Sequence, residues 1–191
     1  MPPKVKFSRE AIGEAAYELV RKEGRDALTA RSLAAVLGTS TAPIFTAFSG
    51  IDEVVSAVWG RAKALYEQYL AEGFSHPLPF KGAGLAYIRF AKEEPRLFRF
   101  LFMETKGASV VSHYLPGNDA NEAAVRAKLE AYGHGTEKAK EIYNHLSVYV
   151  HGLATLYACG STVFTDEDIE RMLSEAYHAF KNNAEATKTE V

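Results

Sequence analysis

The sequence predicts an all-α protein of about nine helices, because apolar residues recur along it at helical spacing. No stretch shows the apolar–polar alternation that is typical of a half-buried strand. Gly24, Gly38 and the pair Pro77 and Pro79 end successive periodic segments, as helix-stopping residues do. We therefore expect a three-helix domain over residues 1–50 and a larger helical domain over residues 51–191.

The first two helices have clear boundaries. Ser8 is the expected N-cap of a helix that runs to Glu23 and is stopped by Gly24. Thr29 is the expected cap of a second helix, which ends at Gly38. A glycine there can adopt positive φ, so the chain can turn sharply without a Cβ clash.

The third helix is short and uncharged. Ser40 or Thr39 is its expected cap, and Pro43 lies in its first turn, where a missing amide costs no hydrogen bond. Helices two and three form the pattern of a helix-turn-helix, in which one helix braces on the DNA backbone and the next lies in the major groove. No charged residue occurs between Ser32 and Ile51, so hydroxyls and methyl groups are the expected contacts with base edges. The alternative interpretation is an ordinary helical hairpin.

A long helix over residues 51–74 follows, for which Ser49 and Asp52 form a capping-box-like pair. Thr165 and Asp168 form a second capping box at the start of the last helix. The other helices are expected over residues 80–94, 95–104, 121–132, 137–158 and 166–183, with a loop over residues 105–118.

Composition restricts the possible functions. The chain has 191 residues, 47% of them hydrophobic and 24% charged, as in an ordinary globular protein. Its single cysteine, Cys159, excludes an internal disulfide and fits a reducing cytoplasm. The N-terminus has no apolar signal core, and the longest apolar run, residues 146–159, is too short to span a bilayer, so we expect a cytoplasmic protein without membrane contact.

Charge is unevenly distributed. Residues 1–50 hold 7 Lys and Arg against 5 Asp and Glu, whereas residues 51–191 hold 15 against 19. The weakly basic part, residues 1–50, carries the helix-turn-helix. This charge distribution suits a chain whose N-terminal part binds DNA and whose remainder has another role.

Catalytic patterns are missing from the sequence. His145 and His151 lie six residues apart, which does not place two imidazoles on one helix face. The sequence has no HExxH motif, no paired Glu-x-x-His and no phosphate-binding glycine loop. We expect neither enzymatic activity nor a metal or other cofactor.

Three N-terminal segments, AIGEAAYELVRKEG, LTARSLAAVLG and STAPIFTAF, agree in spacing and residue type with a known pattern. Residues 8–58 resemble the N-terminal domain of TetR/AcrR-type bacterial transcriptional regulators. YIRFAKEEPRLFRFLF, residues 87–102, and VYVHGLATLY, residues 148–157, are similar to stretches of the C-terminal domain. The second is similar to the W-x-x-H-G-L-A-x-L segment of one subgroup, without its tryptophan. The resemblance implies a ligand-responsive regulator, most often a repressor, that dimerises through a bundle of its last two helices.

Phe45 and Ile51 depart from the family pattern, because relatives usually carry there a tyrosine and a lysine that touch phosphate. Each missing cationic contact lowers the salt slope of binding by about 0.9, so we expect weakened DNA affinity or substitute contacts. Arg31, the amides that follow Gly50 and an N-terminal arm with Arg9 are candidate substitutes. The predicted DNA contacts are Lys4, Lys6, Arg31, Thr39, Ser40, Thr41, Pro43, Phe45 and Thr46.

Two alternatives remain open for this end of the chain. Phe45 and Ile51 can instead cover apolar surface of the core. The rival function is a dimeric small-molecule-binding or interaction module that keeps the fold with weakened or lost DNA binding.

Aromatic residues gather in the second domain and suit the wall of a cavity for an unknown small-molecule effector. The predicted lining is Trp59, Tyr66, Phe98, Phe102, His145 and Tyr149. The simpler interpretation of any one of them is core packing.

The helix over residues 137–158 is apolar on more than one face, so it needs cover on two sides, which a second copy of the chain can supply. The predicted dimer interface comprises Val150, Leu153, Ala154, Tyr157, Leu173, Tyr177 and Phe180. The alternative is full burial within one subunit.

Overall fold

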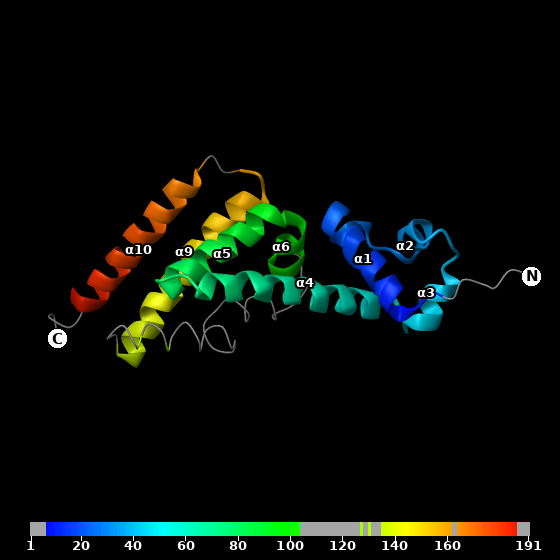
Figure 1. Cartoon of the computed structure of the whole chain (residues 1–191), viewed down its shortest axis with the longest axis horizontal. Coiled ribbons are helices and arrows are strands. Elements are labelled where there is room, and N and C mark those ends of the chain that lie inside the picture. Colours follow the sequence, from blue (N-terminus) through cyan, green and yellow to red (C-terminus); the bar gives the residue numbers. More distant parts are fainter. Residues whose placement is uncertain (1–6, 104–126, 128–129, 131–134, 162–163, 187–191) are drawn as a thin grey trace, which may run out of the picture. The chain divides into compact units, whose positions relative to one another are not determined.

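The computed structural model describes residues 7–103, 127, 130, 135–161 and 164–186, whose regular elements are helices, with no strand among them (Figure 1). The all-α prediction is confirmed. Of the predicted helix over residues 121–132 only Ala127 and Glu130 are described, and the predicted loop over residues 105–118 lies outside the described residues, as do Lys4 and Lys6.

The described residues form two compact units. The first holds those of Met1–Leu65 and Arg96–Glu104, and the second those of Tyr66–Pro95 and Thr105–Val191. The predicted boundary at residue 50 between a DNA-binding and a regulatory domain stays a prediction, because compactness does not assign a function.

The first unit contains the three N-terminal helices. Ser8 caps α1 by accepting a hydrogen bond from the Ala11 amide, and Gly24 at φ 93° ends this helix, as expected. Apolar side chains from every part of the unit are buried in its core: Ile12, Val20, Leu28, Leu33, Ile44, Phe48, Val54, Leu97 and Phe98. Its elements are α1 (Arg9–Glu23), the 3₁₀ turn η1 (Arg25–Ala27), α2 (Ala30–Val36), α3 (Ala42–Ala47), the first part of α4 (Ile51–Phe74) and most of α6 (Pro95–Phe102).

Two predicted caps are wrong. The N-cap of α3 is Thr41, not Ser40 or Thr39, and its side chain makes no capping hydrogen bond; Pro43 does lie in the first turn. The carboxylate that binds Ser49 at the start of α4 belongs to Glu53, not to Asp52. Because α4 begins at Ile51, one residue later than a cap at Ser49 requires, the third helical position falls on Glu53.

In the second unit, α9 (Thr136–Ala158) packs against both α5 (Pro79–Glu93) and α10 (Asp166–Ala186) (Figure 1). The predicted capping box of α10 is confirmed, since the Asp168 amide donates to Thr165 Oγ1 and the Thr165 amide donates to Asp168 Oδ2, each at 3.1 Å. One core cluster joins α9 to α10 through Ala139, Ile142, Leu146 and Ala176, with Phe74, Tyr143, Tyr149, Tyr177 and Phe180 packed around it.

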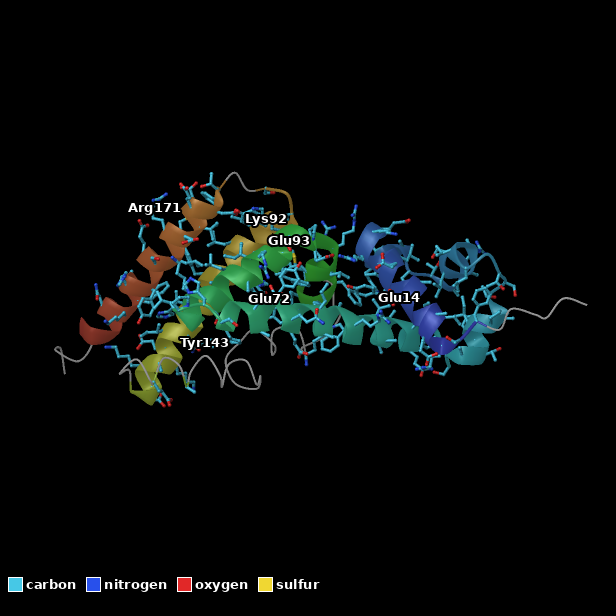
Figure 2. All side chains as sticks on the ribbon, viewed as in Figure 1. Glu14, Glu72, Lys92, Glu93, Tyr143 and Arg171 are labelled. Carbon is cyan, nitrogen blue, oxygen red and sulfur yellow. The ribbon has the colours of Figure 1, made fainter. Side chains whose placement is uncertain are left out.

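The end of α4 crosses α5 at very close range. A Cβ placed on Gly73 would lie 2.5 Å from the carbonyl oxygen of Gly82, and one placed on Gly82 would clash with the carbonyl oxygen of Gly73. Only glycine permits this approach of the two backbones. Glu72, which is labelled on α4 in Figure 2, forms an ion pair with Arg89 of α5 at the surface.

Candidate nucleic-acid interface and regulatory core

The turn between α2 and α3 is fixed by local hydrogen bonds. Thr29 and Ser32 cap α2 reciprocally. At the other end, Gly38 adopts φ 63°, and the Thr39 amide donates to the Ala34 carbonyl at 3.0 Å. This left-handed glycine closes the last turn of α2 and redirects the chain into α3.

One side of α3 faces the core and the other faces solvent. Ile44 and Phe48 are buried, while Phe45 is 52% exposed and Thr46 is exposed beside it. Phe45 therefore does not serve as a core residue of the isolated chain. Of the other predicted DNA contacts, Arg31 and Ser40 are exposed, and Thr39, Thr41 and Pro43 are half-buried.

A polar junction joins α1 to the start of α4. Arg9 donates to Glu53 Oε1 and to the Ala47 carbonyl, each at 2.6 Å, and its guanidinium lies 4.1 Å from the centre of the Phe48 ring. The Ser49 amide donates to Glu53 Oε2 at 2.6 Å. This amide, followed by Arg9, lowers the pKa of Glu53 to about 2.

The junction weakens two candidate phosphate contacts. Arg9 is held by protein groups, and the carboxylates of Asp52 and Glu53 stand in the first turn of α4, where the helix dipole favours them over a phosphate. Arg31, another of the proposed substitutes, is exposed on α2. Periodicity alone missed this junction, although an arginine at the start of one helix and a glutamate in the first turn of another were visible signals.

The residues predicted to line an effector cavity are divided between the units. Trp59, Phe98 and Phe102 belong to the first, and Tyr66, His145 and Tyr149 belong to the second. Four of the six contact an aromatic ring of their own unit: the Phe98 and Phe102 rings lie 5.0 Å apart, Tyr66 packs on Tyr87 and Phe90, and His145 packs on Phe180. Effector binding by this set stays a prediction.

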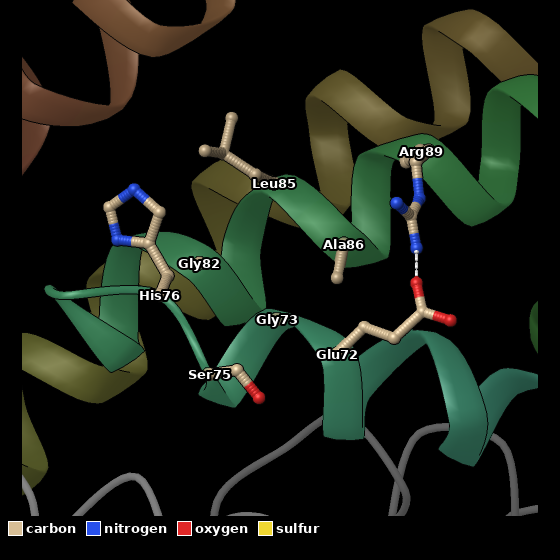
Figure 3. A pocket seen from close by; sticks show the side chains of 8 residues that line it. All are labelled: Glu72, Gly73, Ser75, His76, Gly82, Leu85, Ala86 and Arg89. Atoms are coloured by element: carbon tan, nitrogen blue, oxygen red, sulfur yellow. Dashed lines mark hydrogen bonds and ion pairs between the residues drawn. The ribbon is translucent and has the colours of Figure 1, made fainter.

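An open cleft of about 320 Å³ lies beside the glycine crossing of α4 and α5 (Figure 3). The Glu72–Arg89 ion pair borders it, and the His76 Nδ1 accepts a hydrogen bond from the Leu78 amide at 2.9 Å. None of the six predicted lining residues contributes to this cleft, which is lined by Glu72, Gly73, Ser75, His76, Gly82, Leu85, Ala86 and Arg89.

A partly buried polar pair that the sequence did not reveal joins α5 to α9. The Tyr87 hydroxyl and His151 Nδ1 lie 2.9 Å apart, and Tyr87 is 5% exposed. Burial lowers the pKa of His151, which favours the neutral imidazole. In the described part of the chain no three histidine, cysteine or carboxylate side chains converge as metal ligands.

Several of the predicted dimer residues are already buried within one chain. Val150, Leu153, Ala154 and Leu173 are already buried there. Tyr157, Tyr177 and Phe180 are half-buried. On the outer side of α9, Val148 is 65% exposed and Leu156 is 40% exposed, with the exposed Gly152 between them. Contact between two copies stays a prediction.

Comparison with known proteins identifies the family. A family model described as the C-terminal domain of tetracycline repressor-like proteins matches residues 80–180, more than half of the chain. The chain therefore belongs to the tetracycline repressor-like (TetR) family, whose members are dimeric DNA-binding transcriptional regulators and generally not enzymes. The subgroup suggested by residues 148–157 stays a prediction.

The fold agrees with this assignment. The chain is similar to the crystal structure of a TetR-like transcriptional regulator from Rhodococcus sp. RHA1, with a TM-score of 0.65 and 16% sequence identity over 93% of this chain and 96% of that chain. No curated protein matches the sequence. No helix among the described residues is long and apolar enough to cross a membrane.

Proposed function

We propose that this protein is a ligand-responsive repressor that binds duplex DNA through α2 and α3 and leaves it when a small-molecule effector binds. The observation that carries the DNA contact is the exposed face of α3, held outward by buried Ile44 and Phe48 and by the turn at Gly38. A helix presented in this way can enter a major groove while α2 contacts the backbone.

Release by the effector depends on α4, which contributes residues to both compact units. A dimer reads half-sites about 34–36 Å apart, so a small change in the separation of its two heads weakens both contacts together. The effector shifts the equilibrium only by its differential affinity for the two separations. An effector bound in the second unit has a continuous helix through which to act on the first.

The rival proposal is a dimeric small-molecule-binding or interaction module that has lost its operator. It is supported by Phe45 and Ile51, which stand where relatives usually carry a phosphate-binding tyrosine and lysine, and by the hydrogen bond from Arg9 to Glu53. Both features lower the electrostatic part of DNA affinity.

Fluorescence anisotropy with duplexes from the gene's own promoter region, at low and at physiological salt, separates the two proposals. A regulator binds at least one duplex at low salt in preference to a scrambled duplex of the same composition. Equal or undetectable binding of both duplexes at low salt would exclude the regulator and favour the module.

A further inference from the structure

The recognition segment lacks every side chain that reads a base by paired hydrogen bonds. From Ser32 to Ile51 the sequence contains no Arg, Lys, Asn, Gln, Asp, Glu or His, and its polar side chains are hydroxyls only. In the major groove, Arg and Lys select guanine, Asn and Gln select adenine, and Asp and Glu select cytosine. None of these three modes is available to α3.

The exposed face of α3 offers apolar groups instead. Phe45 is 52% exposed, and Ala42 and Thr46 are exposed on the same short helix. Thr46 Oγ1 already donates its hydrogen to the Ala42 carbonyl at 2.9 Å, so Thr46 offers another molecule its methyl group and an oxygen that can only accept. The helix therefore presents a methyl group and an aromatic ring.

Thymine is the base that offers a matching apolar group in the major groove, its 5-methyl. We infer that α3 recognises DNA by contact of Phe45 and Thr46 with the 5-methyl groups of pyrimidines, thymine above all. The hydroxyls of Thr39, Ser40 and Thr41 cannot replace this mode, because a hydroxyl both donates and accepts and so does not distinguish the bases. The inference rests on the proposed function, since it requires that α3 enter the groove.

Pyrimidine methylation follows from the same chemistry. 5-Methylcytosine places its methyl group at the position of the thymine methyl, and α3 has no carboxylate with which to read the neighbouring amino group. At a contacted position, 5-methylcytosine therefore replaces thymine, whereas cytosine and uracil do not.

The test begins with duplexes that the full-length protein itself selects at low salt from a library randomised over about 30 base pairs, enough for two half-sites. Each conserved thymine is then replaced by uracil, which removes only the methyl group. We expect about a fourfold loss of affinity for each contacted methyl, and about fifteenfold when both half-sites lose it. Replacement of the same thymine–adenine pair by cytosine–guanine lowers affinity, and 5-methylcytosine–guanine restores it.

Variants of the exposed α3 residues locate the contact. Thr46→Ser keeps the hydroxyl and removes the methyl group, so it should lower affinity and reduce the effect of uracil. Thr46→Val keeps a methyl group and removes the hydroxyl, so it should bind as tightly as the wild type. Phe45→Ala removes the ring and should also reduce the uracil effect.

The outcomes distinguish this inference from the proposed function. If no duplex is enriched, both are overturned. If a duplex is enriched but uracil binds as well as thymine, the methyl inference alone is overturned. It is equally overturned if the uracil effect is unchanged in both Thr46→Ser and Phe45→Ala, because the effect then arises from DNA shape.

Discussion

Arg9 and Glu53 form an ion pair, 2.6 Å between Nη2 and Oε1, that joins the start of α1 to the first turn of α4. The same guanidinium donates to the Ala47 carbonyl at the end of α3 and lies over the Phe48 ring. One side chain of α1 therefore contacts both the end of α3 and the start of α4. Because its guanidinium is bound by these protein groups, Arg9 is less available to contact a phosphate.

Glu53 should make the stability of the protein depend on pH in acid. Its pKa lies at about 2 in the folded chain, below the ordinary value of 4.5. A lowered pKa means that the folded state favours the carboxylate, so its contribution is complete above about pH 4.5 and is lost as the pH falls towards about 2. Urea denaturation should show Glu53→Gln clearly less stable than the wild type near neutral pH, with the difference shrinking below pH 4.5.

An Arg9→Gln background is the control for this prediction. Glu53→Gln should cost less stability there than in the wild type, because one partner of the carboxylate has already been removed. Parallel stability curves for the wild type and Glu53→Gln across the acid range would show that the junction does not hold Glu53 as described.

Ile51→Lys should strengthen DNA binding and make it more sensitive to salt. Ile51 is the half-buried first residue of α4, where relatives usually carry a phosphate-binding lysine. An added phosphate contact steepens the plot of log affinity against log salt by about 0.9 in each half-site. Ile51→Gln is the matched control, since it removes the same apolar side chain without adding charge. Equal slopes for the two variants would mean that this end of α4 does not meet the DNA backbone.

The sequence predicts local interactions well. The Thr165–Asp168 box, the cap at Ser8 and the place of Pro43 depend on residues within one helical turn. The sequence pairs Ser49 with Asp52 instead of Glu53 only if Ser49 is the cap, whereas Gly50 is the residue that precedes Ile51, where α4 begins.

Contacts between distant residues were not predictable in the same way. Arg9 and Glu53 are 44 positions apart, and Tyr87 and His151 are 64 apart. Periodicity shows which face of a helix is apolar, but it does not show which helix covers that face. For the same reason the aromatic residues were recognised as a group, while their division between two compact units was not.

Gly82→Ala should destabilise the second unit. A Cβ at this position would clash with the carbonyl oxygen of Gly73, a backbone atom that cannot rotate away. Overpacking of this kind costs about 1–3 kcal/mol. Gly60→Ala in the exposed part of α4 is the matched control, because its added Cβ would enter open space. It should gain about 0.5–1 kcal/mol from helix propensity. Urea denaturation of both variants checks the prediction, and a Gly82→Ala protein as stable as the wild type would contradict the close crossing.

The outer side of α9 should be the place where a second copy of the chain binds. Val148, at 65% exposure, and Leu156, at 40%, lie there on either side of exposed Gly152, while the opposite side of the helix is buried against α5 and α10. Exposed apolar side chains on a helix that already has one buried face indicate a second partner. A twofold dimer uses the same patch from both copies, so position 148 contributes two valines, one from each copy, to the interface.

Val148→Glu should therefore produce a monomer in sedimentation velocity at micromolar concentration, because the substitution brings two carboxylates into one apolar interface. Val36→Glu is the matched control, since Val36 is a valine of nearly the same exposure, 58%, on α2. That variant should remain dimeric even if it loses DNA affinity. If both variants sediment as a wild-type dimer does, the dimer contact lies away from Val148. If the wild type is itself monomeric, it cannot bind two half-sites as a preformed dimer, and the proposed release mechanism is wrong.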